Sequence, residues 1–267
     1  ILRKDIERLR YASGVTILDS GDQLSVVKNC MKELNLDPKK FEPRGILSAI
    51  SSAKNELISA KRYDEKAVSF YENVVAQVYR AYEKKLKANN SLDFDDLIMK
   101  TIELFKQEPE VLQFYQKKFQ YIHVDEYQDT NRAQYMLCKL LADAHHNLCV
   151  VGDSDQSIYK WRGADISNIL NFEKDYPEAQ VILLEQNYRS TKTILDAANQ
   201  VIANNMGRKP KNLWTDAEQG NKIKVFIGDT EHDEAYFIAR DILDNRERGM
   251  RMADHAILYR TNAQSRV

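Results

Sequence analysis

Two adjacent carboxylates, Asp125 and Glu126, follow a short apolar run that begins at Tyr121. Such a strand end can place one carboxylate on Mg²⁺, which prefers oxygen ligands and keeps several waters, so that phosphates complete its shell. The second carboxylate can act as a base that polarises water in line with a terminal phosphate. Acidic strand ends are also common without any chemistry, and Asp129 suits the cap of a helix over 131–144. The pair alone leaves both interpretations open.

A polar loop over 152–164 is the second candidate. It sets Tyr159 and Trp161 two residues apart, with Lys160 between them and Arg162 after them. Aromatic faces beside cations suit stacking on unpaired bases, while the cations meet phosphates. The alternative is that the two rings anchor the loop in the core, although loops generally lie at the surface.

Two further polar strand ends follow along the chain. Arg189 lies between a predicted strand and a helix, where it can reach a phosphate, and Tyr188 beside it can lie on a base. A surface Arg189 that pairs with Glu185 is the simpler interpretation of this segment taken alone. The last strand end, 259–266, contains two arginines and says little by itself.

Composition excludes several classes of protein. The 267 residues are 43% hydrophobic and 30% charged, which is typical of a globular protein and argues against intrinsic disorder. No run approaches the roughly 18 apolar residues of a membrane span. The cysteines Cys30, Cys138 and Cys149 form no C-x-x-C, which argues against zinc and redox motifs and favours small buried or half-buried thiols in a reducing cytoplasm.

The net charge of −1 conceals three differently charged segments. Residues 1–92 contain 17 Lys and Arg against 12 Asp and Glu, residues 93–180 contain 9 against 16, and residues 181–267 contain 13 against 12. The first segment can therefore contact phosphates, whereas the acidic middle needs a bound cation to hold a nucleotide. Ordinary solvated helix faces explain the first excess equally well.

Apolar spacing divides the chain into a helical part and a mixed part. Helices are predicted over 23–34, 44–58, 66–88, 97–107 and 109–119. From residue 121 strands alternate with helices. Strands are predicted over 121–125, 147–152, 181–184, 222–227 and 255–260, and helices over 131–144, 164–172, 191–204 and 233–247. The 147–152 strand is apolar throughout and should be covered on both faces.

This alternation of strands and helices predicts an α/β fold with parallel sheets and right-handed crossovers. In such sheets functional residues lie at the carboxyl ends of strands. The polar segments that follow Val124, Val151, Leu184 and Tyr259 all occupy such ends.

Taken together and in this order, the motifs are highly specific. D-E-Y-Q-D, G-D-S-D-Q-S-I-Y-K-W-R-G-A, Q-N-Y-R-S-T and L-Y-R-T-N-A-Q-S-R resemble those of superfamily 1A DNA helicases of the UvrD/Rep type. The resemblance implies RecA-like parallel-sheet motor lobes of the P-loop NTPase type with an all-α inserted domain. It implies the helical domain 1B over 1–92, the remainder of lobe 1A over 93–182 and the start of lobe 2A over 183–267.

The resemblance also implies roles at the nucleotide, with ATP and Mg²⁺ as cofactors. Asp125 would bind Mg²⁺, and Glu126 would be the base that orients water. Gln156 would sense the γ-phosphate and link hydrolysis to the DNA side. Arg189 would reach the γ-phosphate as an arginine finger, and Tyr188 would stack on the adenine.

On the DNA side, the resemblance makes Tyr159 and Trp161 platforms for single-stranded bases, with Arg162 beside them. Arg260 and Asn262 would contact the DNA strand. The implied activity is ATP-driven 3′→5′ translocation and unwinding in repair and plasmid replication, in the cytoplasm and away from membranes. The implied partners are single-stranded DNA and the single-strand–duplex junction, with repair proteins, RNA polymerase or a plasmid replication initiator as protein candidates.

The chain departs from the family above all because it contains no G-x-x-x-x-G-K-[ST] phosphate loop. We therefore expect a piece of a longer protein that does not hydrolyse ATP by itself. Two alternatives remain. One is the helicase subunit of a recombination nuclease complex, which shares D-E-x-Q-D and Q-N-Y-R-S. The other is a non-catalytic module for DNA binding or protein docking.

Overall fold

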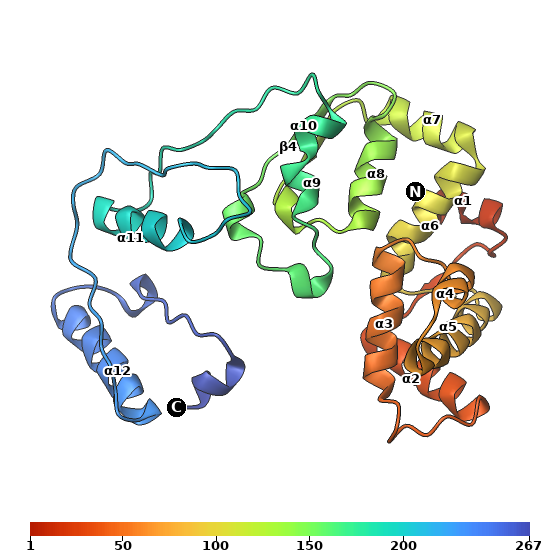
Figure 1. Cartoon of the computed structure of the whole chain (residues 1–267), viewed down its shortest axis with the longest axis horizontal. Helices are drawn as coiled ribbons and strands as arrows, with labels where there is room; N and C mark the ends of the chain where they lie inside the picture. The colour runs from red at the N-terminus through yellow and green to blue at the C-terminus, as the bar shows by residue number, and fades with distance from the viewer. The chain divides into compact units, whose positions relative to one another are not determined.

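The computed structural model describes residues 1–267, and most of the first 92 form helices (Figure 1). The elements are α1 (Leu2–Asp5), the short 3-10 helix η1 (Ile6–Leu9), α2 (Ser20–Glu33), α3 (Pro43–Asn55), α4 (Ala60–Lys66) and α5 (Phe70–Ala88). The helices predicted over 23–34 and 44–58 are confirmed as α2 and α3. Both differ from the predicted ranges by only a few residues at their ends.

The single helix predicted over 66–88 is wrong at its start, because α4 ends at Lys66 and α5 begins at Phe70. Ser69 accepts a hydrogen bond from the Glu72 N–H, and the Glu72 carboxylate accepts one from the Ser69 N–H. This reciprocal capping box satisfies two backbone donors that have no partner inside a helix. A strong N-terminal signal therefore starts a new helix where apolar spacing alone continues the old one.

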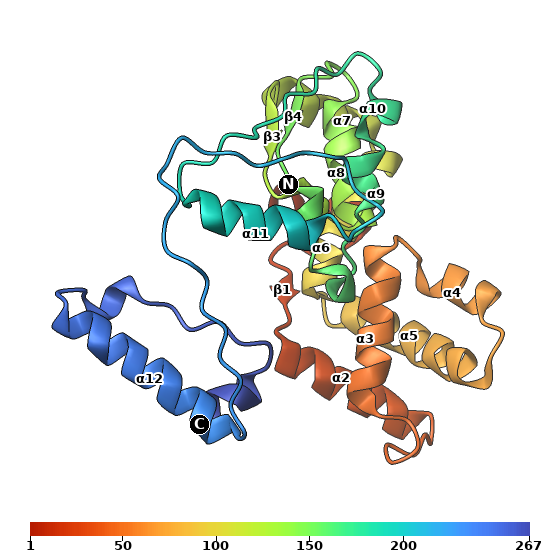
Figure 2. The same ribbon diagram turned by 60° about the vertical axis from the view of Figure 1, so that its left-hand side comes forward.

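Helices α2, α3 and α5 pack together around one core, and Figure 2 shows them side by side. Each helix turns an apolar stripe inward, as expected for amphipathic helices whose stability comes from packing. The buried side chains include Val27, Met31, Ile46, Ile50, Val75, Val78, Tyr79 and Tyr82.

A second core joins the N-terminal helices to the next three. These are α6 (Phe94–Gln107), α7 (Pro109–Lys118) and α8 (Arg132–Ala142), which confirm the helices predicted over 97–107, 109–119 and 131–144. Asp93 and Asp96 form the capping box of α6, as its acidic start suggests. The buried side chains of this core are Leu2, Ile6, Leu9, Leu92, Leu104, Phe105, Val111 and Tyr115.

A buried ionic cluster joins α3, α5 and α6. The Lys54 ammonium is 0% exposed and lies 2.7 Å from Glu83, 2.8 Å from Asp93 and 2.9 Å from Asp96. The Tyr82 hydroxyl donates to Asp93 at 3.0 Å. Burial lowers the pKa of Lys54, but the three carboxylates outweigh it and hold that pKa well above its usual range. Burial raises the pKa of Asp96 to about 7 in spite of Lys54.

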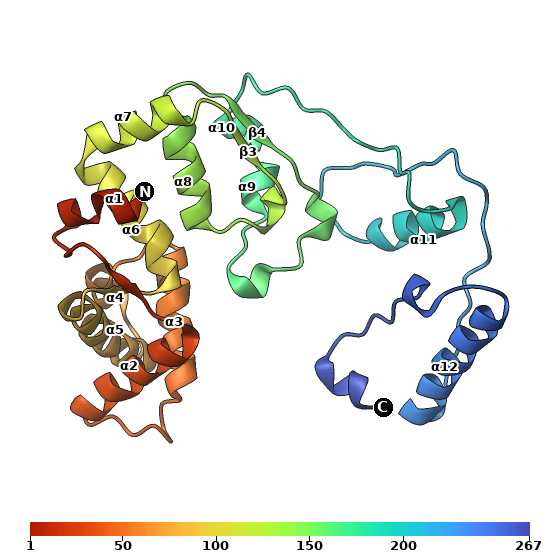
Figure 3. The same cartoon turned by 180° about the vertical axis from the view of Figure 1, so that it is seen from behind.

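Two parallel pairs of short strands accompany these helices. β1 (Thr16–Ile17) pairs with β2 (Ser91–Leu92), and β3 (Ile122–Val124) pairs with β4 (Leu148–Val150). The register of the second pair sets Ile122 opposite Leu148 and Val124 opposite Val150. Helix α8 is the crossover between β3 and β4, so the predicted strand–helix–strand unit is confirmed (Figure 3). The prediction that β4 is covered on both faces is wrong, because Cys149 and Val151 are exposed.

The helix predicted over 164–172 is also wrong in its extent. Two short helices stand there, α9 (Ser167–Leu170) and α10 (Phe172–Asp175), with Asn171 between them at φ −99 and ψ 6. Ala164 and Asp165 precede α9 because they belong to the loop, where the Asp165 N–H donates to the Thr130 carbonyl at 2.9 Å. Tertiary contacts to the β3 turn thus shorten the helix.

The chain divides into two compact units. The first contains Ile1–Ile182 with Gly207–Pro210, and the second contains Leu183–Met206 with Lys211–Val267. The second unit contains α11 (Lys192–Ile202) and α12 (Glu231–Glu247), which confirm the helices predicted over 191–204 and 233–247. No helix in either unit is long and apolar enough to cross a membrane.

The strands predicted over 181–184, 222–227 and 255–260 are not formed. Pairing in this part is limited to one parallel bridge between Gln186 and Trp214. A strand needs a neighbour to satisfy its N–H and C=O groups, and these apolar segments have no neighbouring strand in the structure. Their apolar side chains are consequently exposed, as at Leu184, Ile227 and Leu258.

Candidate nucleotide and nucleic-acid site

Asp125 and Glu126 lie at the carboxyl end of β3, and both are exposed. The Glu126 N–H donates to Asp125 Oδ1 at 2.9 Å, and Glu126 has the left-handed conformation at φ 49 and ψ 42. A non-glycine residue pays roughly 1–2 kcal/mol for that conformation, and such strain gathers at functional sites. The reversal lets the Tyr127 N–H return to the Val151 carbonyl at 3.0 Å. The turn is thereby tied to the end of β4.

Gln128 is the centre of this turn, although its place in the sequence predicts no role for it. Its side chain is 1% exposed. The amide donates to Glu126 Oε2 at 2.8 Å and accepts from the Asp153 N–H at 2.9 Å. A Cβ added to Gly152 would lie 2.5 Å from Gln128 Oε1, so only glycine fits there without displacing the amide. The signal for Gln128 is its burial, because a buried side-chain amide requires hydrogen-bond partners.

The structure corrects the proposed cap at Asp129. Asn131 caps α8 instead, accepting from the Gln134 N–H at 2.9 Å, while Gln134 accepts from the Asn131 N–H at 2.9 Å. Asp129 Oδ1 is buried without a hydrogen-bond partner. Burial, and next the charge of Glu126, raise the pKa of Asp129. Helix capping therefore does not explain the carboxylate of Asp129.

Hydrogen bonds to its own acidic residues stabilise the loop after β4. Asp153 accepts from the Asp155 N–H at 2.9 Å and from Gln156 Nε2 at 2.8 Å. Asp155 in turn receives both 2.7 Å hydrogen bonds of a bidentate pair with Arg208, another contact without a sequence signal. Gln156 is therefore held three hydrogen bonds from Glu126, through Gln128 and Asp153.

Tyr159, Trp161 and Arg162 lie together farther along this loop. The two ring centroids are 6.4 Å apart, and the Arg162 guanidinium lies 5.1 Å from the Tyr159 ring and 4.5 Å from the Trp161 ring. Trp161 is 74% exposed. The interpretation of these rings as core anchors is therefore wrong. An exposed ring beside a cation has the chemistry that stacks on a nucleic-acid base.

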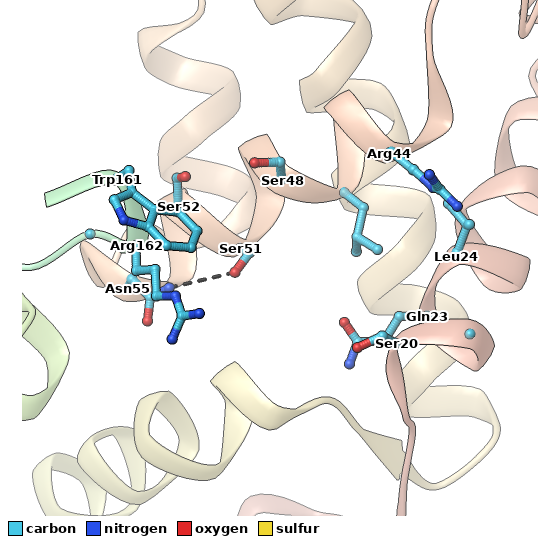
Figure 4. A pocket seen from close by; sticks show the side chains of 13 residues that line it. Ser20, Gln23, Leu24, Arg44, Ser48, Ser51, Ser52, Asn55, Trp161 and Arg162 are labelled. Carbon is cyan, nitrogen blue, oxygen red and sulfur yellow. Dashed lines mark hydrogen bonds between the residues drawn. The ribbon is translucent and has the colours of Figure 1, made fainter. Parts of the chain in front are cut away.

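A groove of about 560 Å³ opens between this loop and α2 and α3 (Figure 4). Its α3 wall presents Ser48, Ser51, Ser52 and Asn55, and Figure 4 shows Trp161 and Arg162 over that wall. Their spacing of three and four residues places them on one helix face, a pattern that is visible in the sequence but was not among the predicted sites. Arg44, Leu24, Gln23 and Ser20 line the other side. Asn55 also accepts from Asn131 at 2.8 Å, which links this wall to the start of α8.

Tyr188, Arg189, Arg260 and Asn262 belong to the second unit, and all four are exposed. The Tyr188 hydroxyl donates to Gln186 at 2.8 Å, and the Arg189 N–H donates to Asn187 at 2.9 Å. Glu185, the partner suggested for Arg189, accepts from the Asn212 N–H at 3.0 Å. The Arg260 N–H donates to Gln264 at 2.8 Å, and Asn262 begins the 3-10 helix η6 (Asn262–Arg266).

The residues fit Mg²⁺ only as a partner of bound phosphate. The structure contains no group of three or more His, Cys, Asp or Glu side chains that could hold a metal ion. Mg²⁺ retains waters and accepts one or two carboxylates together with phosphate oxygens, so the exposed Asp125 carboxylate suffices as the protein ligand.

A parallel β–α–β unit thus places paired carboxylates at one strand end and an aromatic–arginine loop after the next strand. Comparison with known families shows the class of protein to which the chain belongs. Residues 1–177 match the UvrD/REP helicase N-terminal domain, and residues 182–267 match the UvrD-like helicase C-terminal domain. The chain belongs to the UvrD-like helicase family.

Curated relatives cover the whole chain. It is 65% identical over 268 residues to the ATP-dependent DNA helicase PcrA of Bacillus subtilis, covering 100% of this chain and 36% of that protein. It is 60% identical over 267 residues to PcrA of Staphylococcus aureus and 57% identical to PcrA of Staphylococcus epidermidis, covering 100% of this chain and 37% of each protein. The chain thus spans a little over a third of the length of these relatives.

Proposed function

We propose that this chain forms part of the motor of an ATP-dependent DNA helicase. One observation carries the proposal: the candidate base Glu126 and the candidate base-stacking loop occupy the ends of adjacent parallel strands and are joined by hydrogen bonds through Gln128. Nucleotide hydrolysis and DNA contact would then act on one connected piece of structure. The relatives named ATP-dependent DNA helicase support the same conclusion.

At the nucleotide, we assign Asp125 to Mg²⁺ and Glu126 to the attacking water. Bound Mg²⁺ would neutralise charge on the ATP phosphates. Glu126 is exposed and held by a neutral amide rather than by a cation, so its carboxylate stays available to accept a proton. Gln156 would release Asp153 to contact the γ-phosphate. From the second unit, Arg189 would serve as the arginine finger and Tyr188 would stack on the adenine.

At the DNA, we assign the groove beside α3 to a single strand. Tyr159 and Trp161 offer exposed rings, and Arg162 adds a cation between them. The hydroxyl and amide wall of α3 suits phosphate and sugar oxygens, which most protein–DNA hydrogen bonds meet. Arg260 and Asn262 of the second unit would contact the same strand.

We further propose that the chain works within a longer protein, as its coverage of the PcrA relatives supports. In this scheme 1–92 is helical domain 1B, 93–182 belongs to RecA-like lobe 1A and 183–267 begins lobe 2A. The phosphate loop would come from residues outside this sequence, so the chain alone would not hydrolyse ATP. Cytoplasmic 3′→5′ translocation in repair and plasmid replication, on a single-strand–duplex junction, completes the proposal. Repair proteins, RNA polymerase or a replication initiator remain the protein partners to test.

The test is ATP turnover by the full-length protein with and without single-stranded DNA. Glu126→Gln should reduce turnover by at least about 10²-fold while ATP still binds, because proton acceptance is lost and the shape is kept. Glu178→Gln, at an exposed carboxylate near His146, is the matched control and should retain turnover. DNA binding without any ATP turnover in the unmodified protein would reject this proposal and favour the non-catalytic module. DNA-stimulated turnover that appears only with a nuclease partner would favour the recombination subunit.

A further inference from the structure

We propose that Gln128 is a positioning residue that fixes the Glu126 carboxylate and couples it to the loop that carries Tyr159 and Trp161. The inference rests on the proposed function, because it gives Gln128 a role in ATP hydrolysis and in its stimulation by DNA. Gln128 itself contacts neither ATP nor DNA in this scheme. It acts through its neighbours.

The orientation of the Gln128 amide follows from its partners. The Asp153 N–H can only donate, so the atom 2.9 Å from it must be the carbonyl oxygen Oε1. The amide nitrogen then faces the opposite side, where Glu126 Oε2 lies at 2.8 Å and Asp129 Oδ2 at 3.4 Å. The two amide hydrogens therefore serve two carboxylates, and the oxygen serves the loop. Reversing the amide would break all three contacts.

Burial keeps this amide in one place. The Gln128 side chain is 1% exposed, and the absence of a side chain at Gly152 gives its oxygen room. The ionisable groups that face it are Glu126 and Asp129 on its own turn and Asp153 on the loop after β4. Without the amide donor, the Glu126 and Asp129 carboxylates would face the same space with no hydrogen-bond donor between them. Their repulsion would move Glu126 away from its present position.

The same amide transmits displacement of the loop. Asp153 donates its N–H to Gln128 and accepts from Gln156 through its carboxylate, so it moves with both residues. The Ser157 hydroxyl donates to the Gln128 carbonyl at 3.4 Å and adds a second tie. A base that stacks on Trp161 and shifts the loop would therefore shift the carboxylate that orients water.

The test uses the full-length protein and three variants. Gln128→Glu keeps the oxygen that accepts from Asp153 but replaces the donor with a second oxygen. Gln128→Leu removes both functions. Gln116→Glu is the matched control, because Gln116 is also buried and donates to the Leu140 carbonyl at 2.8 Å, away from the turn. We measure kcat and KM for ATP with and without oligo(dT). The measurements cover a range from about pH 5.5 to about pH 8.5, in which a carboxyl group can gain or lose a proton.

Gln128→Glu should lower kcat by about 10²-fold at the alkaline end with little change in KM, as expected when a reacting group is slightly misplaced. The loss should shrink as the pH falls, because a proton shared by the two carboxyls restores an O–H donor to Glu126. Gln128→Leu should lose activity and DNA stimulation at every pH, and Gln116→Glu should keep the pH profile of the unmodified protein.

Two results would overturn the inference. One is unmodified kcat and DNA stimulation in Gln128→Glu. The other is a loss that is equal at every pH and follows a fall in melting temperature and in ATP affinity, which means packing alone. If the unmodified protein shows no DNA-stimulated turnover, the proposed function fails and this inference fails with it; a failure confined to Gln128→Glu leaves the proposed function intact.

Discussion

Apolar segments form paired strands in the first unit but remain unpaired in the second. In the first unit, β3 and β4 pair in parallel and α8 crosses between them. In the second unit, 222–227 is equally apolar but stays unpaired, and its side chains are exposed. Helices form in both units because a helix satisfies its hydrogen bonds within its own segment, whereas a strand depends on a neighbour. The difference shows that strand formation here is decided by what lies alongside.

Removing the buried cation should produce the largest effect and would test how far the first unit depends on buried contacts. Lys54→Met should destabilise that unit by about 3–5 kcal/mol, because Glu83, Asp93 and Asp96 would be left close together without a counter-charge. Urea denaturation followed by circular dichroism measures the change. Lys28→Met on the exposed face of α2 is the control and should stay within about 0.5 kcal/mol. Equal stability of the two variants would show that the cluster contributes nothing.

A paired isoleucine substitution sharpens the contrast directly. Ile50 of α3 is 1% exposed and Ile227 is 89% exposed. Ile50→Ala should cost about 2–5 kcal/mol because it leaves a cavity in a packed core. Ile227→Ala should change stability by no more than about 0.5 kcal/mol. The same denaturation experiment on this chain compares them, and a similar large cost at both positions would mean that 222–227 is covered in solution.

The smallest expected effect concerns two exposed aromatic residues, one in each unit. Trp161 is 74% exposed and Tyr236 of α12 is 77% exposed, but only Trp161 lines the groove and contacts Arg162. Trp161→Ala should weaken binding of oligo(dT) to the full-length protein by about 1–3 kcal/mol, measured by fluorescence anisotropy. Tyr236→Ala should leave it unchanged. Unchanged affinity in Trp161→Ala with a lowered melting temperature would contradict the stacking role.

The sequence predicted local structure well where the segment itself carries the information. The spacing of Val27 and Met31 predicts α2, and the acidic start at Asp93 and Asp96 is a visible helix signal. The late start of α9 and the unpaired 255–260 segment were mispredicted because they depend on parts of the chain that are distant in sequence. Apolar spacing cannot show whether a neighbouring strand is present.

The sequence predicted the residues of the candidate site that could do chemistry, but not the residues that position them. Asp125 and Trp161 stood out because they belong to motifs that are specific when they are taken together and in order. Gln128 and the serine face of α3 did not, because a buried amide and small hydroxyls acquire meaning only through the neighbours that folding provides. The substitutions of Glu126, Gln128 and Trp161 described above test three of the assigned roles.

The Lys54 cluster also has a mechanical consequence. It joins the last turn of α3 to the first turn of α6, directly after β2 ends at Leu92. A junction held by two buried charged contacts, with a third from the same ammonium to Glu83 of α5, resists bending and shear. Torque applied to α3 would therefore pass into α6 instead of being absorbed by a hinge, and amide hydrogens on both sides of residue 93 should exchange in a single cooperative opening.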